Sequence, residues 1–510
     1  MKKMAVLVLI SYLFVACSGN METNIMAKDI DKTSTLIEAN KNSNVVFILV
    51  DDLGYSDIKA YNQNSFYETP NVDQLALTGT KFNNGYSANP VCSPSRYALL
   101  TGKHPSRVDS TDFFRHDKRK RRAENFEPAA IKGFLASEEQ TMAETFQENG
   151  YTTSFLGKWH LGSEEKHWPE NNGFDVNVGG HAAGSPSGYF SPHKNPRLSD
   201  GEEGEYLTER LTNEAINLLD GYAKQDKPFF MYLAYYTVHT PLGAPQETVD
   251  KYENKAKQLG LTNKDSDFKV EEQVWPVDTP RKVRTVQNHA TYAAMVEEMD
   301  NNVGRILDKL KQTGLDKDTI IVFTSDNGGL STSEGSPTSN LPLRGGKGWL
   351  YEGGIKVPYI VKLPNTSSTG IEVNTPVFGT DFYPTLTQLV GIKPDNKDVI
   401  DGISLKSLLA GDDITKDLTR PLFFHYPHYS NQGGFPGSAV RLGDWKLIER
   451  FEDGSQNLFN LSKDPGELVD LAETNPQKLN ELTKILHNWY VDVDAKFLQE
   501  KSGKSPWTPN

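Results

Sequence analysis

Residues 45–52 read Val45-Val46-Phe47-Ile48-Leu49-Val50-Asp51-Asp52, a continuous apolar run that ends in two aspartates. Such runs are typical of strands that are buried on both faces of a parallel sheet. Segments of similar character follow at 151–156, 229–236 and 319–324. Helical patterns lie between them, at 72–77, 141–148, 207–219 and 290–310. This alternation predicts an α/β fold whose central sheet is mostly parallel or mixed and is flanked by helices.

The pattern changes after about residue 390, and a chain of 510 residues is too long for one ordinary core. Short antiparallel strands are expected at 421–426, 439–449 and 458–461, and a closing helix is expected at 475–490. We therefore predict a large α/β domain over residues 43–390 and a smaller α+β domain over residues 391–510.

The N-terminus has the features of an export signal, because Lys2 and Lys3 precede an apolar run that reaches Ala16. That run is too short to span a membrane comfortably. Val15-Ala16-Cys17 resembles the end of a bacterial lipoprotein signal, so residues 1–17 are predicted to end at a lipidated Cys17. Plain cleavage, with Cys17 incidental, is the alternative. Residues 18–42 are polar and are predicted to be a tether. The expected location is the periplasm or the outer membrane, with the lipid as the only membrane anchor.

The chain is acidic, with 54 basic and 67 acidic residues and a formal net charge of −13. Sequence-independent binding to nucleic acid needs a basic surface, so no nucleic-acid partner is expected. Bulk charge does not set the local field of a pocket, and an anionic substrate remains compatible with this composition.

Polar side chains follow each of the four predicted buried strands. The residues concerned are Asp51 and Asp52, Lys158 and His160, His239, and Asp326 and Asn327. In open α/β sheets, ligands bind beyond the carboxyl ends of the strands. Any one of these residues alone would be ordinary loop polarity, but their recurrence after successive strands predicts a site at this edge of the sheet.

The acidic members of this set are suited to a hard cation. Asp51, Asp52, Asp326 and Asn327 offer oxygen ligands, which favour calcium or magnesium over zinc or copper. Three carboxylates held together would repel one another without a cation. Capping of helix N-termini is the alternative role for Asp and Asn in these positions.

A lone cysteine opens the sharpest motif, Cys92-Ser93-Pro94-Ser95-Arg96, which continues as Tyr97-Ala98-Leu99-Leu100-Thr101-Gly102. Pro94 suits the first turn of a helix and Gly102 its end. Cys92 is then expected at the positive end of that helix, near Arg96, where negative charge on or near its side chain is stabilised. The alternative is a buried, inert cysteine. The only other cysteine is Cys17, so a disulfide is not expected.

These residues resemble the formylglycine-dependent type I sulfatases of the alkaline phosphatase superfamily, whose core motif is Cys-X-Pro-Ser-Arg followed by an Ala/Leu-rich turn and Thr-Gly. The resemblance covers nearly the whole chain after the N-terminal segment. Further motifs that carry it are Asp51-Asp52-Leu53-Gly54, Gly157-Lys158-Trp159-His160, His239-Thr240-Pro241, Ser325-Asp326-Asn327-Gly328, Arg344-Gly345-Gly346-Lys347, Glu352-Gly353-Gly354 and Asp464-Pro465-Gly466-Glu467.

The resemblance implies a modified nucleophile and a bound metal. Cys92 would be oxidised to formylglycine (3-oxoalanine) by a formylglycine-generating or anaerobic sulfatase-maturating enzyme, and its aldehyde would be hydrated to a diol. One calcium ion would be held by Asp51, Asp52, Asp326 and Asn327 together with residue 92. An alkaline phosphatase-like catalytic domain over residues 43–390 is implied as well.

The resemblance also assigns roles to the basic residues. Arg96 would steady the diol, and Lys158 and Lys347 would clamp the sulfate. His239 would be the general acid near the leaving oxygen, and His160 would accompany the diol and assist sulfate release. Taken singly, His239 or Lys158 could equally be turn or surface residues.

The implied reaction is hydrolysis of sulfate monoesters, and the implied substrates are sulfated carbohydrates such as algal polysaccharides or glycosaminoglycans. Polarity and nearness to the motif-bearing loops suggest the sugar contacts His104, Arg107, Asp112, His181, His425, His428 and Arg441. Two alternatives are a phosphonate monoester or phosphodiester hydrolase of the same superfamily and a non-catalytic glycan-binding lipoprotein. The pattern around Lys158, His160, His239 and Lys347 favours sulfate over phosphate, and the intact metal set with Cys92 argues against loss of catalysis.

Overall fold

The computed structural model describes residues 42–114, 125–262, 264–271, 282–364, 370–393, 399–411 and 419–509. The predicted signal, the predicted lipidation site Cys17 and all but the last residue of the predicted tether lie outside these ranges. Within them, no helix is long and apolar enough to cross a membrane. The boundary expected near residue 390 stays a prediction.

An eight-stranded mixed sheet forms the centre of the fold, in the order β11-β2-β10-β9-β1-β6-β4-β5. Its strands are β1 (Asn44–Val50), β2 (Thr80–Phe82), β4 (Thr152–Gly157), β5 (Val176–Val178), β6 (Phe229–Tyr235), β9 (Thr319–Ser325), β10 (Tyr359–Lys362) and β11 (Ile371–Val373). All neighbours pair in parallel except β10, which is antiparallel to both β9 and β2. The four strands predicted from apolar runs are therefore confirmed, and they are the adjacent strands β9, β1, β6 and β4.

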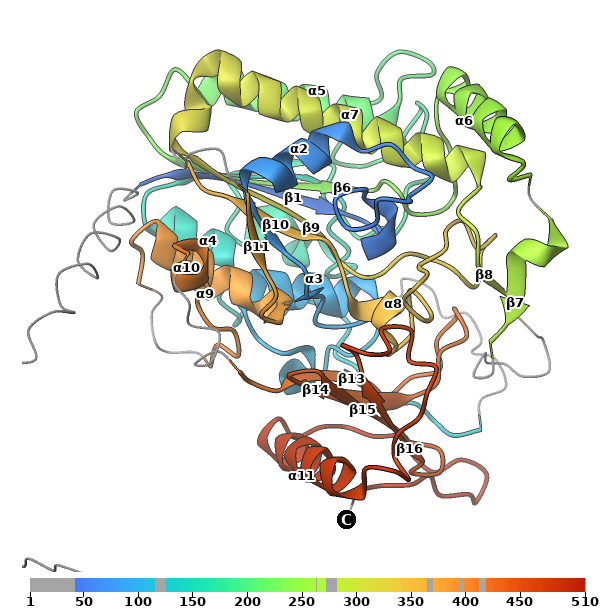
Figure 1. The fold of residues 1–510 in the computed structure, drawn as a ribbon. Helices are drawn as coiled ribbons and strands as arrows, with labels where there is room; N and C mark the ends of the chain where they lie inside the picture. The colour runs from blue at the N-terminus through green and yellow to red at the C-terminus, as the bar shows by residue number, and fades with distance from the viewer. Residues whose placement is uncertain are drawn as a thin grey trace, which may run out of the picture. The chain divides into compact units, whose positions relative to one another are not determined.

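Helices cover both faces of this sheet (Figure 1). On one face lie α2 (Pro70–Thr78), α5 (Leu207–Tyr222) and α7 (Ala290–Thr313), and on the other lie α3 (Cys92–Thr101), α4 (Met142–Glu148) and α9 (Phe382–Leu389). The alternation of side chains along β1 explains why both faces are apolar. Val46 and Ile48 belong to the core beneath α5 and α7, whereas Phe47 stacks on Tyr232 and meets Phe382 of α9 edge-on.

The last part of the described chain forms an antiparallel sheet of four strands that packs against helix α11 (Figure 1). Its elements are β13 (Leu422–Tyr426), β14 (Gly437–Leu442), β15 (Trp445–Arg450), β16 (Gln456–Asn460) and α11 (Pro476–Asp492). The antiparallel sheet and closing helix were predicted, but residues 439–449 form parts of two strands, not one. A turn at Gly443, with φ of +60°, reverses the chain between them.

The remaining elements are short, apart from one further helix. They are α6 (Gln246–Leu259), α8 (Glu352–Ile355), α10 (Lys406–Leu409), β3 (Gly85–Tyr86), β7 (Phe268–Val270), β8 (Lys282–Arg284) and β12 (Val377–Phe378). Single 3-10 turns are η2 (Tyr55–Asp57), η3 (Pro105–Val108), η4 (Glu165–His167), η5 (Pro169–Asn171), η6 (Asp265–Asp267), η7 (Leu315–Asp318) and η8 (Gly379–Asp381).

Candidate active site

The polar residues that follow β9, β1, β6 and β4 meet at one edge of the sheet, as predicted. We call Asp51, Asp52, Asp326 and Asn327, with the cations that contact them, the strand-end site. Asp52 and His160 have φ of +60° and +59°, a left-handed conformation that is uncommon for residues with a side chain. Such strain gathers at functional sites. Turns, not helices, follow β1 and β9, so capping of helices by these acids is excluded.

Two buried lysines pair with the first two aspartates. The Nζ atom of Lys158 lies 2.6 Å from Oδ2 of Asp51, and the Nζ atom of Lys347 lies 2.8 Å from Oδ2 of Asp52. The side chains of Lys158 and Asp51 are both 0% exposed. Charges removed from water in this way need close partners, because desolvation disfavours them strongly.

The third aspartate and the asparagine complete the strand-end site. Oδ2 of Asp326 accepts a hydrogen bond from Nε of Arg96 at 2.8 Å, and Oδ1 accepts one from the backbone N–H of Asp52 at 3.1 Å. The Asn327 amide nitrogen donates to Oδ1 of Asp52 at 2.8 Å. Arg96 also donates to the backbone oxygen of Lys158 at 2.7 Å, so one guanidinium links two strand ends.

Two oxygens of the strand-end site accept no hydrogen bond. They are Oδ1 of Asp51, whose nearest ion-pair partner is Nη2 of Arg96 at 3.5 Å, and Oδ1 of Asn327. Leaving a buried acceptor unsatisfied costs about 1–3 kcal/mol. Two such oxygens in one buried acidic cluster therefore fit a cation that is bound through oxygen.

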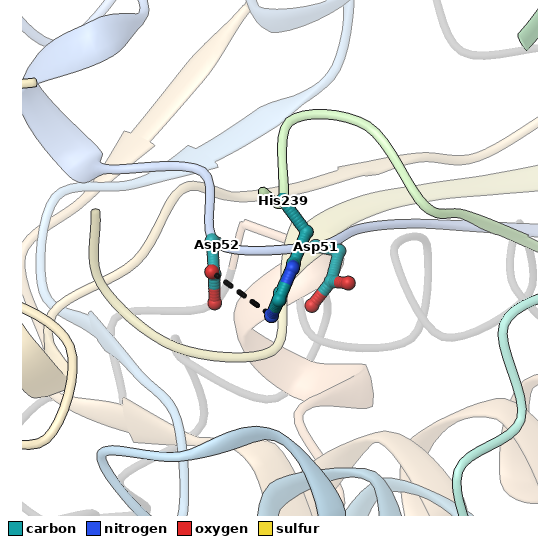
Figure 2. Close-up of side chains that lie close together, drawn as sticks. All are labelled: Asp51, Asp52 and His239. Atoms are coloured by element: carbon teal, nitrogen blue, oxygen red, sulfur yellow. Dashed lines mark ion pairs between the residues drawn. The ribbon is translucent and has the colours of Figure 1, made fainter. Parts of the chain in front are cut away.

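A ring nitrogen of His239 lies near the same acids (Figure 2). Ligand atoms of Asp51, Asp52 and His239 all lie within 4.8 Å of one another. However, Nε2 of His239 accepts from the Lys347 ammonium at 3.0 Å, and Nδ1 donates to the backbone oxygen of Thr240 at 2.6 Å. Both ring nitrogens are thus engaged, and the four oxygen-bearing residues form the better metal set.

The three aspartates differ in the direction in which their surroundings shift their pKa values. Burial raises the pKa of Asp51 well above its ordinary value, and the charges of Asp326 and Asp52 add to this rise. Burial also opposes ionisation of Asp52 and Asp326, but Lys347 lowers the pKa of Asp52 and Arg96 lowers that of Asp326. Asp51 is therefore the aspartate whose negative charge is least compensated, as expected where carboxylates crowd one another.

Cys92 is the first residue of α3, which ends at Thr101 before Gly102 in the left-handed conformation. This helix was predicted with the same ends. The Sγ atom lies 3.5 Å from Nδ1 of His160, whose Nε2 donates to the backbone oxygen of Phe114 at 2.8 Å. The side chain is 3% exposed, and its burial raises the pKa of the Cys92 thiol, although the charges of Lys158 and Lys347 oppose this rise.

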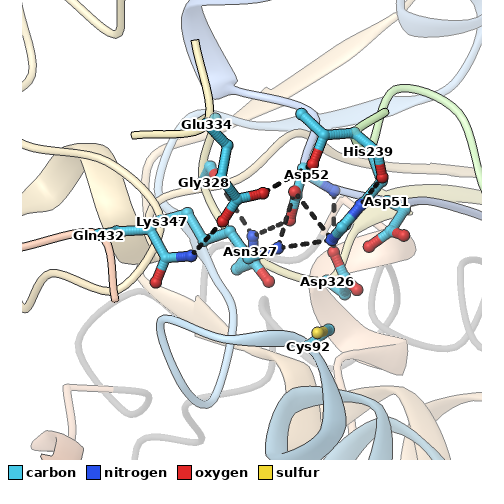
Figure 3. A network of polar contacts seen from close by, with 12 residues as sticks. Asp51, Asp52, Cys92, His239, Asp326, Asn327, Gly328, Glu334, Lys347 and Gln432 are labelled. Atoms are coloured by element: carbon cyan, nitrogen blue, oxygen red, sulfur yellow. Dashed lines mark hydrogen bonds and ion pairs between the residues drawn. The ribbon is translucent and has the colours of Figure 1, made fainter. Parts of the chain in front are cut away.

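Lys347 and His239 belong to a wider polar network at this site (Figure 3). Burial, followed by the charge of Lys347, lowers the pKa of His239 to about 4, so His239 is neutral as it stands. The network extends to Glu334 and Gln432, which we did not predict. Glu334 accepts from Thr240 Oγ1 at 2.6 Å and from Gln432 Nε2 at 3.2 Å. No periodicity or motif in the sequence marks these two loop residues.

The residues proposed from sequence as sugar contacts lie in several parts of the fold. His104, Arg107, His425 and Arg441 contact Phe423, Asp401, Lys496 and Tyr86, respectively, and these contacts hold structural elements together. His428 contacts Thr111 and Asp112 contacts Tyr426. The backbone oxygen of His181 accepts from His160 N at 3.3 Å, which brings His181 next to the site.

Comparison with known proteins identifies the class. The family profile described as Sulfatase matches residues 43–392, and the profile described as N-sulphoglucosamine sulphohydrolase, C-terminal, matches residues 346–496. The chain belongs to the sulfatase family, within the alkaline phosphatase superfamily, and is a sulfuric ester hydrolase.

Several named relatives are similar to the chain over most of its length. A protein of Formosa agariphila named Sulfatase is 30% identical, and the alignment covers 91% of each chain. The N-acetylgalactosamine-6-sulfatase of Mus musculus is 31% identical over 87% of this chain and 79% of its own. The crystal structure of Ps i-CgsB in complex with k-i-k-neocarrahexaose has a TM-score of 0.71 and 29% identity, over 89% of this chain and 93% of that chain.

Proposed function

We propose that this sulfatase removes sulfate from carbohydrates, using a formylglycine made from Cys92 and a calcium ion held by the strand-end site. The observation that carries the metal part is the pair of buried, unsatisfied oxygens, Oδ1 of Asp51 and Oδ1 of Asn327. The family generally uses formylglycine and a metal ion, and Cys92 stands where its motif requires the modified residue.

The donor set supports calcium or magnesium rather than a transition metal. Asp51, Asp52, Asp326 and Asn327 offer only oxygen, which hard cations prefer. Calcium tolerates irregular shells of six to eight oxygens, so residue 92 and the substrate sulfate can complete the set. When present, the ion supplies positive charge opposite the sulfate oxygens, and the formylglycine hydrate supplies an oxygen nucleophile.

The chain's own residues then bind and orient the ester. Lys158 and Lys347 are buried ammonium groups whose charges reach Cys92, so they hold a sulfate beside residue 92. Arg96 fixes Asp326 and the Lys158 backbone, and this rigidity keeps the cations preorganised. His160 faces residue 92 through Nδ1, where it can accept a proton from that residue.

Departure of the sugar requires a proton on the leaving oxygen, since an alkoxide is a poor leaving group. We propose His239 as the donor once it carries a proton on Nε2, the atom that here accepts from Lys347 at 3.0 Å. The negative charge of a bound sulfate favours this protonation. A positioned general acid typically contributes about 10²- to 10⁴-fold to the rate.

Substrate class and location rest on the relatives and the sequence. The relatives include an N-acetylgalactosamine-6-sulfatase and a structure that holds a neocarrahexaose, which supports sulfated polysaccharide or glycosaminoglycan fragments as substrates. Substrates of this kind fit an exported enzyme that is anchored at Cys17 in the periplasm or outer membrane. Its Cys92 would be matured by a formylglycine-generating or anaerobic sulfatase-maturating enzyme.

Two measurements test this proposal. Mass spectrometry of the tryptic peptide that contains Cys92, from protein made in the native host, should show an aldehyde in place of the thiol. Sulfate release should be measured on N-acetylgalactosamine 6-sulfate, glucosamine sulfates and sulfated neocarra-oligosaccharides. An intact thiol in active protein, or higher kcat/KM on aryl phosphodiesters than on any sulfate ester, would refute it.

A further inference from the structure

Glu334 combines an exposed position with an inward-turned carboxylate. It lies in the loop after β9 and its backbone has φ of +51°, the left-handed conformation that is uncommon outside glycine. Oε2 accepts from the hydroxyl of Thr240, and Oε1 accepts from the side-chain amide of Gln432. Thr240 directly follows His239, and Gln432 lies in the loop between β13 and β14. Two segments far apart in sequence therefore hold this carboxylate at the edge of the site (Figure 3).

The loop that carries Gln432 packs against Gly348, the residue after Lys347, because glycine has no side chain to exclude it. Gly348 has φ of +80°, and a Cβ atom there would stand 2.0 Å from Oγ of Ser430 and 2.9 Å from Oε1 of Gln432. Oγ of Ser430 in turn lies 2.9 Å from Oε1 of Gln432, which leaves the amide nitrogen directed to Glu334. The Gln432 side chain is buried, so the amide group that donates to Glu334 is held in one orientation.

The carboxylate of Glu334 is ionised at neutral pH. Burial of the group opposes this, but the nearby Lys347 charge and the Thr240 hydrogen bond lower the pKa of Glu334. An ionised carboxylate only accepts hydrogen bonds and has about four acceptor sites. Thr240 and Gln432 each use one site, so the group can accept further donors from a ligand.

We propose that Glu334 is a specificity-determining residue that accepts a hydrogen bond from a hydroxyl or amide N–H of the sugar and disfavours a second sulfate there. This inference rests on the proposed function, in which His239 faces the leaving oxygen. The sugar that carries this oxygen must then lie on the His239 side, next to Thr240 and Glu334. The substrate class is a sugar with a neutral hydrogen-bond donor, and no second anion, beside the ester that is cleaved.

A carboxylate at this position distinguishes sugars that present a hydroxyl from sugars that present a second anion, in two ways. Hydrogen bonds to a charged group are stronger than neutral ones, so a hydroxyl donor gains from the contact. A second sulfate, or the carboxylate of a uronic acid, is repelled by the negative charge of Glu334 and offers Glu334 no hydrogen-bond donor. If Glu334 acted only by orienting His239 and Lys347, its removal would affect every sulfate ester alike.

The test compares wild-type enzyme, Glu334→Gln and the surface control Glu247→Gln on matched esters. The pairs are N-acetylgalactosamine 6-sulfate with its 4,6-disulfate and glucosamine 6-sulfate with its 2-N,6-O-disulfate, and 4-nitrophenyl sulfate reports reaction without sugar donors. Wild-type enzyme and Glu247→Gln should prefer the monosulfate. Glu334→Gln should lose about tenfold or more in kcat/KM on the monosulfate. It should lose much less on the disulfate, so that the disulfate-to-monosulfate ratio rises, and should change little on the aryl ester.

Three results would overturn the inference: an unchanged ratio, an equal loss on all esters including the aryl sulfate, or wild-type turnover of the aryl ester with none of the sugar sulfates. These results differ from failure of the proposed function. If wild-type enzyme released no sulfate from any ester, or kept an unmodified Cys92 thiol, the proposed function would fail before Glu334 was tested. Circular dichroism of Glu334→Gln, compared with Glu247→Gln, verifies that the substituted loop leaves the fold intact.

Discussion

The strand-end site and a second buried group of charges differ in how completely their oxygens are matched. The second group, the Lys446 cluster, consists of Lys446, Glu352 and Glu467. Nζ of Lys446 lies 3.0 Å from Oε1 of Glu352 and 2.8 Å from Oε1 of Glu467. The remaining oxygens accept from the hydroxyl of Tyr86 at 2.5 Å and from the backbone N–H of Glu352 at 2.7 Å.

Three of the four carboxylate oxygens of the Lys446 cluster accept a hydrogen bond, and the fourth, Oε1 of Glu467, accepts none but lies 2.8 Å from the Lys446 ammonium. In the strand-end site, Oδ1 of Asp51 and Oδ1 of Asn327 accept no hydrogen bond, and the ion-pair partner of Oδ1 of Asp51 is 3.5 Å away. Breaking a closed cluster of this kind is costly, because it leaves a buried charge without its partner. An open cluster is suited to receive a charged ligand. The difference teaches that buried charge alone does not mark a functional site, whereas two unmatched oxygens in one cluster, without a cation within 3.0 Å of the Asp51 oxygen, point to a ligand.

The largest expected effect is a loss of activity when Cys92, beside the strand-end site, is replaced. Replacing Cys92 by Ala should lower kcat/KM on any sulfate ester by about 10⁴-fold or more, since it removes the nucleophile of the proposed reaction. Thermal unfolding should change little, because the substitution is small and uncharged. Steady-state sulfate release and differential scanning calorimetry check both expectations. Residual activity near that of wild type would mean that residue 92 is not the nucleophile.

Disrupting the Lys446 cluster should have the opposite profile. Lys446→Met leaves two buried carboxylates without their shared cation and should destabilise the protein by about 3–5 kcal/mol. Chemical denaturation measures this loss, and Lys478→Ala, which removes an exposed ion pair with Glu481, is the matched control. Folded Lys446→Met should keep its Cys92 modification. A stability equal to that of the control would contradict the structural role.

A pH dependence of stability should trace to Glu467. Burial raises the pKa of Glu467 to about 7, although Lys446 opposes this rise. A carboxyl group whose folded pKa is raised holds its proton more tightly when folded, so its contribution is complete below the unfolded pKa and is lost as pH rises through about 7. Between pH 5 and pH 7, Glu467→Gln should therefore show a smaller fall in Tm than wild type. Parallel Tm profiles for the two proteins would contradict this assignment.

The smallest effect concerns Arg107, which sequence reasoning placed among the sugar contacts. Its guanidinium lies 2.8 Å from Oδ1 of Asp401 and 2.8 Å from Oδ2 of Asp492 in α11. We expect Arg107→Gln to lower stability by about 1 kcal/mol or less and to leave kcat/KM unchanged. A selective rise in KM for sugar sulfates, with no effect on 4-nitrophenyl sulfate, would restore the binding role.

The sequence predicted the core of the fold because its signals are local. The apolar run before Asp51 and three similar runs are the four central strands, and Pro94 and Gly102 gave the helix after Cys92 its correct position. The antiparallel β10, its neighbour β2 and the edge strands β11 and β5 escaped prediction because they are only three or four residues long. Residues 439–449 were predicted as one strand because Gly443 was not recognised as a turn.

For the site, sequence reasoning succeeded where a residue follows a buried strand. Asp51, Asp326, Lys158 and His239 had to meet at one sheet edge once the strands were parallel. Glu334 belongs to a polar loop, and its partner Gln432 lies 98 residues away along the chain. Their contact depends on how two loops fold over Lys347, which no local pattern encodes.

The contrast between the open and closed clusters is tested most directly by calcium titration. Isothermal titration calorimetry of protein freed of metal by a chelator should show one Ca²⁺ per chain. Asn327→Ala, which removes one of the unmatched oxygens, should bind about tenfold or more weakly. Arg107→Gln should bind like wild type. Absence of binding in the wild-type protein, or equal affinity in Asn327→Ala, would contradict the claim that the strand-end site is open because it holds a cation.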